Sequence, residues 1–449
     1  MRTRSLLSVT IALACAGTTA WAQDPPASTD DATTAVSSQD AQDTTSDMAS
    51  DFAEDHAHAD AGMSSSPRWT GTASLAAVAA SGTRDLDDAG RRFGIALRGR
   101  GEWRQDGWRA LGEVAFGSDR LAYDDAPWLR QAWLSHARGP VEVRIGRQII
   151  AWGRADRLNP TDNLSARNMR ALVADIDEDR MGLDSASVRL QLGERVNLTA
   201  LHAPRMPATV LPDAIASLPA LFGGRRVSDQ SSSRDTQALR IDYAGSALDA
   251  SISVVDGPSM TPAFASHAYP LQAIQPGVRI VGADFSAALG DRWGLRGEFA
   301  STAFDRSVPQ GLGDFRYAVL GVERHIDGGW LALAQWVHRR ADRAPAAPTL
   351  AGTLNRAVWF QTEARSDALY LGLNRAQFEG ALSGNIGLLQ TLDDRGRAWF
   401  ANLAYRIDDR WNLLARWQHF SGPAETNLGA LRRDSLLLLE LRGTWGGSR

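Results

Sequence analysis

Apolar and polar residues alternate along the C-terminal two-thirds of the chain, in segments of about ten residues, the length of a membrane-crossing strand. In residues 91–104, Phe93 and Ile95 fall on one face while Arg98 and Arg100 fall on the other. A period of two residues is that of a β-strand with one apolar and one polar face. The same alternation is clear in three further segments, 183–193, 235–244 and 434–445. The pattern predicts an all-β protein.

We expect about eighteen strands from residue 68 onward, the order of strand number found in porin barrels. They cover residues 69–81, 91–104, 107–117, 127–137, 140–149, 183–193, 195–203, 235–244, 247–256, 277–289, 292–303, 314–326, 329–340, 366–377, 380–391, 397–407, 411–420 and 434–445. Roughly sixteen strands is the nearest alternative, because residues 329–377 are difficult to divide.

Two kinds of connection alternate between these strands: very short turns and loops of up to about thirty residues. The short turns are Gln105-Asp106, Arg138-Gly139-Pro140, Gly193-Glu194, Gly245-Ser246, Gly290-Asp291, Asp327-Gly328, Glu379-Gly380 and Asp408-Asp409. This alternation is typical of a transmembrane antiparallel β-barrel, in which closure pairs every backbone amide within the lipid. An even number of strands puts both ends of the barrel on the short-turn side, which we expect to be periplasmic.

A soluble β-sandwich would also alternate, but with its apolar face inward. Here the polar face carries many charges that a dry core would not accept, so it should face water and the apolar face should face lipid. Tryptophans support the barrel, because indole favours the membrane interface. Those predicted near the short-turn rim are Trp69, Trp103, Trp108, Trp293, Trp330, Trp411 and Trp445, and those predicted toward the other rim are Trp128, Trp399 and Trp417.

Residues 1–22 have the features of a secretory signal peptide. Arg2 and Arg4 precede an apolar run at 6–16, and Ala20-Trp21-Ala22 is a small-x-small cleavage site. The apolar run is too short to span a membrane as a helix. An exported chain with many alternating strands indicates the outer membrane of a Gram-negative cell.

The only cysteine, Cys15, lies within this signal, so the mature chain cannot form a disulfide. Lipidation of Cys15 is an alternative that the better cleavage site at 20–22 disfavours. Residues 23–67 form an acidic, periplasmic leader that we expect to be disordered, because it has few large apolar residues. The barrel then occupies residues 68–449.

Within the leader, His56 and His58 lie beside Glu54, Asp55 and Asp60, which could form a weak metal site. A solvated linker is the simpler interpretation, and we expect no metal and no cofactor. The net charge of −4 is too small to imply a nucleic-acid partner. The chain has no lysine, so all 48 basic residues are arginines with permanently charged guanidinium groups.

The long connection at residues 150–182 is the strongest candidate for a pore constriction. Its candidate residues at the neck are Arg154, Asp156, Arg157 and Asp162, and a second charged run lies at 175–180. Thr161 or Asp162 could cap a short helix running toward Met169. Charged rings at a constriction select ions by sign and field. The alternative is a solvent-exposed loop with local ion pairs. The connection 204–234 carries an unusually apolar stretch at 212–222, which could plug the mouth or bind a hydrophobic solute.

The predicted polar faces carry charges of both signs. The candidates for the pore wall are Arg98, Arg100, Glu142, Arg144, Arg189 and Arg240, with Arg296, Glu102, Glu113, Asp242 and Glu298 also on the lining. A mixed lining should produce a transverse field and weak ion selectivity.

The segment Arg144-Ile145-Gly146-Arg147-Gln148-Ile149-Ile150-Ala151-Trp152-Gly153, followed by Asn159-Pro160-Thr161-Asp162-Asn163-Leu164, prompts a comparison. It resembles a poorly characterised family of proteobacterial outer-membrane barrels that is similar to the alginate-export porins. The resemblance implies a porin-like fold and an RND-type exporter as a possible partner. Alginate-export porins line the pore densely with arginine to attract a polyanion, whereas the lining expected here is mixed in sign.

We therefore expect a porin-like channel for passive diffusion or export of small hydrophilic or amphipathic solutes, narrowed by residues 150–182. A non-conducting accessory barrel beside an exporter is the alternative. A hydrolase is less favoured, because no histidine lies in a recognisable nucleophile motif; we expect no enzyme activity. The expected partners are outer-membrane lipid, lipopolysaccharide and the barrel-assembly machinery.

Overall fold

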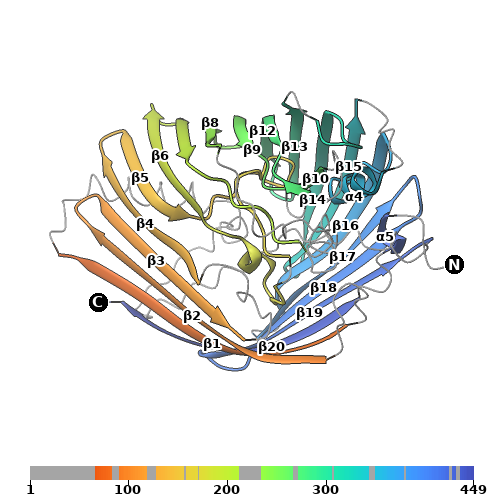
Figure 1. Ribbon diagram of the computed structural model, residues 1–449. Coiled ribbons are helices and arrows are strands. Elements are labelled where there is room, and N and C mark those ends of the chain that lie inside the picture. Colours follow the sequence, from red (N-terminus) through yellow and green to blue (C-terminus); the bar gives the residue numbers. More distant parts are fainter. Residues whose placement is uncertain are drawn as a thin grey trace.

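A computed structural model describes residues 66–82, 91–118, 128–155, 158–169, 171–211, 234–265, 272–305, 308–342, 349–378, 381–423, 427–430 and 435–448. They form a closed barrel of 18 antiparallel strands. Each strand pairs with the next along the chain, and the last, β20 (Leu436–Ser448), pairs with the first, β1 (Arg68–Gly82). Figure 1 shows this wall with a long loop running inside it.

The other strands of the wall follow in chain order. They are β2 (Arg91–Gln105), β3 (Trp108–Gly117), β4 (Leu129–Arg138), β5 (Val141–Gln148), β6 (Leu183–Leu192), β7 (Val196–Ala203), β8 (Thr236–Ala244), β9 (Leu248–Pro258), β12 (Gly277–Leu289), β13 (Trp293–Phe304), β14 (Phe315–Ile326), β15 (Trp330–Ala341), β16 (Arg365–Phe378), β17 (Leu382–Thr391), β18 (Arg397–Arg406) and β19 (Trp411–Ser421). A small hairpin, β10 (Ala263–Ala265) with β11 (Gln272–Ile274), lies outside the wall's pairing between β9 and β12.

The predicted eighteen-stranded antiparallel barrel is confirmed, and the sixteen-strand alternative is wrong. Residues 329–377 contain β15, helix α4 (Leu350–Val358) and β16. The alternation pattern missed α4 because it predicts strands only. The last strand also runs past its predicted end at 445, because Gly446, Gly447 and Ser448 pair with the start of β1.

The apolar face of the wall points outward. Phe93 and Ile95 on β2 are 71% and 61% exposed, whereas Glu298 and Asp284 on the other face of the sheet are 3% and 4% exposed. In a soluble sandwich this distribution would be reversed, because its large apolar residues would be buried. The outer face therefore suits lipid, and the charged face lines the interior. Among the described residues, no helix is both long and apolar enough to cross a membrane.

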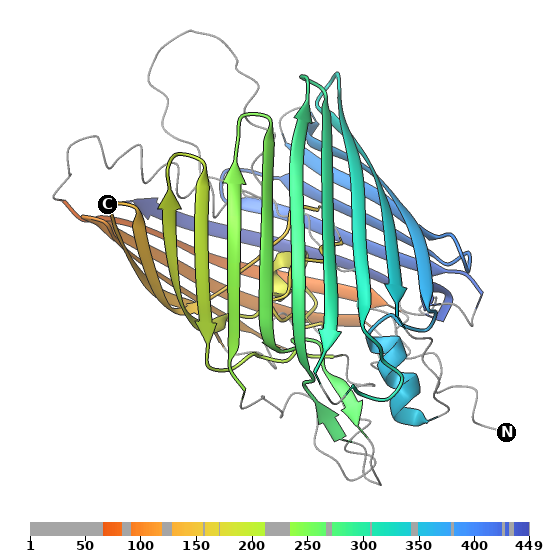
Figure 2. The same ribbon diagram turned by 90° about the horizontal axis from the view of Figure 1, so that it is seen from above.

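Tryptophans pair across neighbouring strands near the rim with the short turns. The rings of Trp69 and Trp103 lie 6.1 Å apart, and those of Trp411 and Trp445 lie 5.7 Å apart. Figure 2 shows the tight turns at one end of the barrel and α4 with the β10–β11 hairpin at the other. The two rims therefore differ as the sequence predicts, with an aromatic girdle at the short-turn end.

The long-loop end contains a hydrophobic core built from several loops. Trp152 and Leu164 come from one loop and Met206 comes from the next. Phe264 lies in β10, and Trp359 follows the last residue of α4. Asn355 on α4 ties these loops together: its Oδ1 accepts from the Phe264 amide at 2.6 Å and its Nδ2 donates to the Phe264 carbonyl at 2.8 Å. The apolar stretch 212–222 lies outside the described residues, so its predicted plug or landing-site role stays untested. The loops are thus packed against one another rather than separately solvated.

The predicted orientation can be tested with inserted epitopes. An epitope placed after Pro423, in the loop between β19 and β20, should be accessible to antibody on intact cells. An epitope between Asp408 and Asp409 should be accessible only after the outer membrane is opened, because that turn joins β18 and β19 at the short-turn rim. Surface staining of intact and permeabilised cells measures both. The reverse pattern would show that the barrel is inserted the other way round.

Candidate pore constriction

Residues 150–182, which we name the crossing loop, enter the barrel and dock on its wall through Glu298 of β13. Glu298 Oε1 accepts from the backbone amides of Arg154 and of Ala155, the latter at 2.5 Å. Its Oε2 accepts from the Thr161 amide at 3.2 Å and from Thr161 Oγ1 at 2.9 Å. One wall carboxylate therefore satisfies four donors of the loop, which fixes the loop's backbone at this point.

The segment Trp152-Gly153-Arg154 explains why this contact is close. Trp152 is buried, with the Arg240 guanidinium 5.4 Å from its ring. Gly153 has a φ of +118°, and a Cβ there would lie 2.8 Å from Glu298 Oε1. Only glycine fits such a position without strain. The segment 144–153, on which the family resemblance partly rests, ends at this glycine. Its end therefore helps to dock the loop on the wall.

Arg154 then extends along the wall of β8, β9 and β12. Its guanidinium lies 2.7 Å from Asp284, 3.6 Å from Asp249 and 3.9 Å from Asp242. Arg240 pairs with two of the same carboxylates, Asp242 at 2.7 Å and Asp284 at 3.0 Å. Two arginines and three aspartates therefore form one charged network where the loop leaves the wall.

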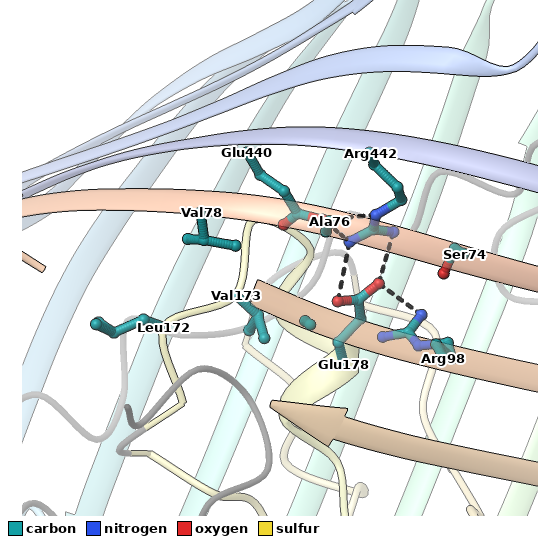
Figure 3. Close-up of a pocket in the computed structure, with 10 residues that line it drawn as sticks. Ser74, Ala76, Val78, Arg98, Leu172, Val173, Glu178, Glu440 and Arg442 are labelled. Carbon is teal, nitrogen blue, oxygen red and sulfur yellow. Dashed lines mark hydrogen bonds and ion pairs between the residues drawn. The ribbon is translucent and has the colours of Figure 1, made fainter. Parts of the chain in front are cut away.

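The far part of the crossing loop, residues 171–180, which we name the distal arm, reaches another part of the wall. Glu178 lies 2.6 Å from Arg98 of β2 and 2.7 Å from Arg442 of β20, as Figure 3 shows. Arg442 also pairs with Glu440 at 2.5 Å. Burial would raise the pKa of Glu178, but Arg98 and Arg442 outweigh burial and lower that pKa to about 2. The carboxylate is therefore ionised at neutral pH.

Two more arginines hold the backbone of the distal arm. Arg130 of β4 donates to the Glu178 carbonyl at 2.5 Å, and Arg416 of β19 donates to the Val173 carbonyl at 3.1 Å. Leu172 and Val173 are buried against β1, β3 and β20. Below them lies a cavity of about 20 Å³, enough for about one water molecule.

The two docking points of the loop lie on opposite sides of the barrel. Around the closed ring of 18 strands, β13, which carries Glu298, is as far from β2, which carries Arg98, in one direction as in the other. A single segment of chain therefore crosses the full width of the interior. This arrangement excludes the alternative of a loop that lies only in external solvent.

The neck residues predicted from the sequence do not form one compact group. Arg154 belongs to the aspartate network on β8, β9 and β12. Asp162 is buried within the loop, 2.5 Å from Arg180 and 3.7 Å from Arg167. Asp156 and Arg157 lie outside the described residues. The predicted helix from Thr161 toward Met169 is wrong for residues 158–169: the Thr161 side chain binds Glu298 and that of Asp162 binds Arg180, so neither caps a helix.

The wall candidates all lie on charged faces of strands. Arg98 pairs with Glu178, Arg100 lies 3.7 Å from Glu113, and Arg144 lies 2.9 Å from Glu142. Arg189 is opposite Glu142 in the register of β5 and β6. Arg240 belongs to the network with Arg154. Each of these arginines therefore has a carboxylate beside it, as a lining of mixed sign requires.

Sequence reasoning assigned Glu298 to the lining but missed its role as the dock of the loop. It also missed Asp284, Arg442 and Glu178 as partners. Alternation along a strand shows which side chains face inward, but not which loop residue meets them across the lumen. The glycine in Trp152-Gly153-Arg154 was the one local signal of a close backbone approach.

The described histidines that lie beside a carboxylate or a hydroxyl group are far apart in the barrel, and one of them, His202, lies 3.7 Å from Asp235. His338 lies 2.8 Å from Asp367, and His419 lies 2.8 Å from Ser435 Oγ. These pairs lie on separate strand pairs and do not combine into a triad. The described residues contain no group of three or more histidine, cysteine or carboxylate side chains placed to hold a metal ion.

No protein-family model matches the chain, and no curated protein matches it in sequence. Solved structures are similar in fold. OccK11 (OpdR) of Pseudomonas aeruginosa has a TM-score of 0.53 at 11% identity, covering 86% of this chain and 98% of its own. The outer membrane protein opdK of the same species has a TM-score of 0.53 at 10% identity, covering 86% and 100%. A BenF-like porin of Pseudomonas fluorescens Pf-5 has a TM-score of 0.52 at 12% identity, covering 86% and 100%. At these identities the likeness shows the fold, so the chain has the barrel architecture of an outer-membrane porin.

Proposed function

We propose that the protein is a passive channel for small hydrophilic or amphipathic solutes, narrowed by the crossing loop. The observation that carries this proposal is the pair of docking points on opposite walls, Glu298 on one side and Arg98 with Arg442 on the other. Charged side chains of both signs surround the loop, which favours a hydrated path of low ion selectivity. Single-channel recording of the purified barrel in a planar bilayer, with a salt gradient, tests it. A barrel that inserts and never conducts would overturn it.

A second candidate is a non-conducting accessory barrel that works beside an RND-type exporter. It is favoured by the extent to which loops fill the interior, including the core around Trp152 and Phe264. In that case export, rather than diffusion, would be the route of solutes, as for the alginate-export porins, to which the family that this sequence resembles is similar. Co-purification of the exporter with a barrel that fails to conduct alone would favour this candidate. With either role, we propose that the apolar outer face of the barrel contacts outer-membrane lipid and lipopolysaccharide. We also propose that insertion of the barrel needs the barrel-assembly machinery.

Ion selectivity should depend on Arg154. Replacing Arg154 with Ser leaves Arg240 as the one guanidinium of the network, facing Asp242, Asp249 and Asp284. Two arginines and three aspartates give the network a formal charge of −1, and loss of Arg154 makes it −2. The local field becomes more negative, so we expect the reversal potential in a KCl gradient to move toward that of a cation-selective pore. Arg154→Lys keeps the charge and should retain the original value. An anion-selective shift in the serine variant would place the ion path away from this network.

A further inference from the structure

We propose that three outward-facing arginines at the long-loop rim, Arg316, Arg340 and Arg365, bind a phosphate group of lipopolysaccharide. We name these residues the arginine row. This inference narrows the proposed contact with lipopolysaccharide to one site on the outer wall. It rests on the orientation that puts the long loops outside the cell, and it holds whether or not the barrel conducts.

The arginine row runs across three neighbouring strands. In the register of β14 and β15, Arg316 is opposite Arg340, and in that of β15 and β16, Arg340 is opposite Arg365. Side chains directly opposite each other on one face of a sheet have their Cβ atoms about 5 Å apart, so like charges there are destabilising. Three guanidinium groups therefore repel one another along the row. An anion bound among them would remove that cost.

The row lies on the outer face of the barrel. Residues an even number of positions apart on a strand share a face, and the row is in step with the exposed apolar residues Leu320, Trp336 and Leu371 of the same strands. The side chains of Arg316 and Arg365 are 56% and 68% exposed, and the middle arginine is exposed as well. A headgroup outside the barrel can therefore reach all three, whereas a solute in the pore cannot.

The height of the row on the wall fits the headgroups of the outer leaflet. Arg316 and Arg340 lie one residue from the ends of their strands and Arg365 begins β16, at the rim that carries α4 in Figure 2. Trp336 lies four residues further down β15, about 13 Å along the strand, and its ring stacks on that of His338 at 5.3 Å. Indole marks the interface between the apolar membrane core and the headgroups. The row is on the water side of that interface, where lipopolysaccharide carries phosphates.

The carboxylates beside the row do not neutralise it. Asp342 lies 3.7 Å from Arg316, and Asp367 lies 2.8 Å from Arg365. Arg340 pairs with no carboxylate in the part of the chain that the structure describes. Three arginines and two aspartates leave a formal charge of +1. Guanidinium groups bind phosphate through paired, charge-assisted hydrogen bonds, so a phosphate suits both the charge and the geometry of the row.

At two other places on this rim, outward-facing arginines lie opposite carboxylates. Arg279 is opposite Asp256 in the register of β9 and β12 and lies 2.8 Å from it. Arg147 is opposite Asp184 in the register of β5 and β6 and lies 2.7 Å from it. These arginines have an anion within the sheet and need none from the membrane. The arginine row departs from this matching of charges, and Arg279 is a control on the same face and rim.

The test is the binding of lipid A, the membrane anchor of lipopolysaccharide. The purified barrel in detergent is titrated with bisphosphorylated lipid A, with dephosphorylated lipid A and with phosphatidylglycerol, and native mass spectrometry gives the bound fraction. The parent should bind bisphosphorylated lipid A about tenfold more tightly than either other lipid, or better, because hydrogen bonds to charged groups are strong. Arg340→Ser should reduce this preference several-fold, and serine at all three positions should abolish it. Arg279→Ser should leave it unchanged.

Thermal unfolding gives a second readout and shows that each variant folds. Bisphosphorylated lipid A should raise the unfolding temperature of the parent, because a ligand that binds the folded state stabilises it. The triple serine variant should show no such rise. If that variant does not fold, Arg340→Ser and Arg340→Lys together provide the test. Lysine keeps the charge but not the planar donor pair, so its preference for phosphate should lie between those of the serine variant and the parent.

Equal binding of phosphorylated and dephosphorylated lipid A to the parent would overturn the site, and so would equal losses in Arg340→Ser and Arg279→Ser. Binding of phosphatidylglycerol as tight as that of lipid A would overturn the assignment to lipopolysaccharide. Conductance is recorded on the same proteins. A barrel that conducts without a preference for phosphate loses the site and keeps the channel, whereas one that shows the preference and never conducts keeps the site and loses the channel.

Discussion

Replacing residues 154–178 with a glycine–serine linker of about ten residues should raise single-channel conductance several-fold. These residues contain both the backbone that docks on Glu298 and the Glu178 side chain that docks on Arg98 and Arg442. Without them, no segment of the crossing loop joins the two opposite walls. The lumen should then hold water where the loop now lies. Planar-bilayer recordings of the purified variant measure the change.

The replacement also removes buried apolar residues of the loop, such as Leu158 and Leu164. The wall itself is held by the pairing of 18 strands in a closed ring, so the variant should still form a barrel. Retained resistance to unfolding by detergent without heating checks this point. A folded variant with unchanged conductance would show that the ion path does not pass the loop, and the neck assigned to Arg154 would be wrong.

Introducing Arg at Leu441 should block insertion of the barrel. Leu441 lies on the outer face of β20 and is 39% exposed. Along β20 it lies between Leu437, which pairs with Trp417 of β19, and Trp445. A charged residue on the lipid face near the bilayer midplane costs about 2–4 kcal/mol. That cost falls on the strand that closes the barrel against β1. Heat-modifiable migration and the yield of protein in outer-membrane fractions measure the loss.

The matched control adds the same charge to the other face. Thr72 lies on β1, beside Arg100 of β2 in the register and on the charged side of the sheet. Thr72→Arg puts a guanidinium in contact with lumen water, so assembly should be close to normal. Equal assembly of the two variants would show that the outer face is not in lipid, and the membrane barrel would need another explanation.

The sequence alone determined the wall of this protein. The two-residue period, the eight short turns and the placement of Trp69, Trp103, Trp411 and Trp445 predicted the number of strands, their bounds and their outer face. These features are local, because a strand's two faces and its turns depend on neighbouring residues. The pattern failed where it had no local signal, at Gly446 to Ser448, which form strand only because β1 lies beside them.

The interior was decided by the tertiary structure. The sequence located the loop 150–182 and its charges, but it grouped Arg154 with Asp162, which in the fold belong to separate networks. The partners of the loop are far away in sequence: Glu298 lies 143 residues from Ala155, and Arg442 lies 264 residues from Glu178. Closing the barrel brings these groups together, and no local pattern records which pairs meet. Ion pairs across a lumen depend on ring closure and register, which is why only the three-dimensional structure showed the loop crossing from wall to wall.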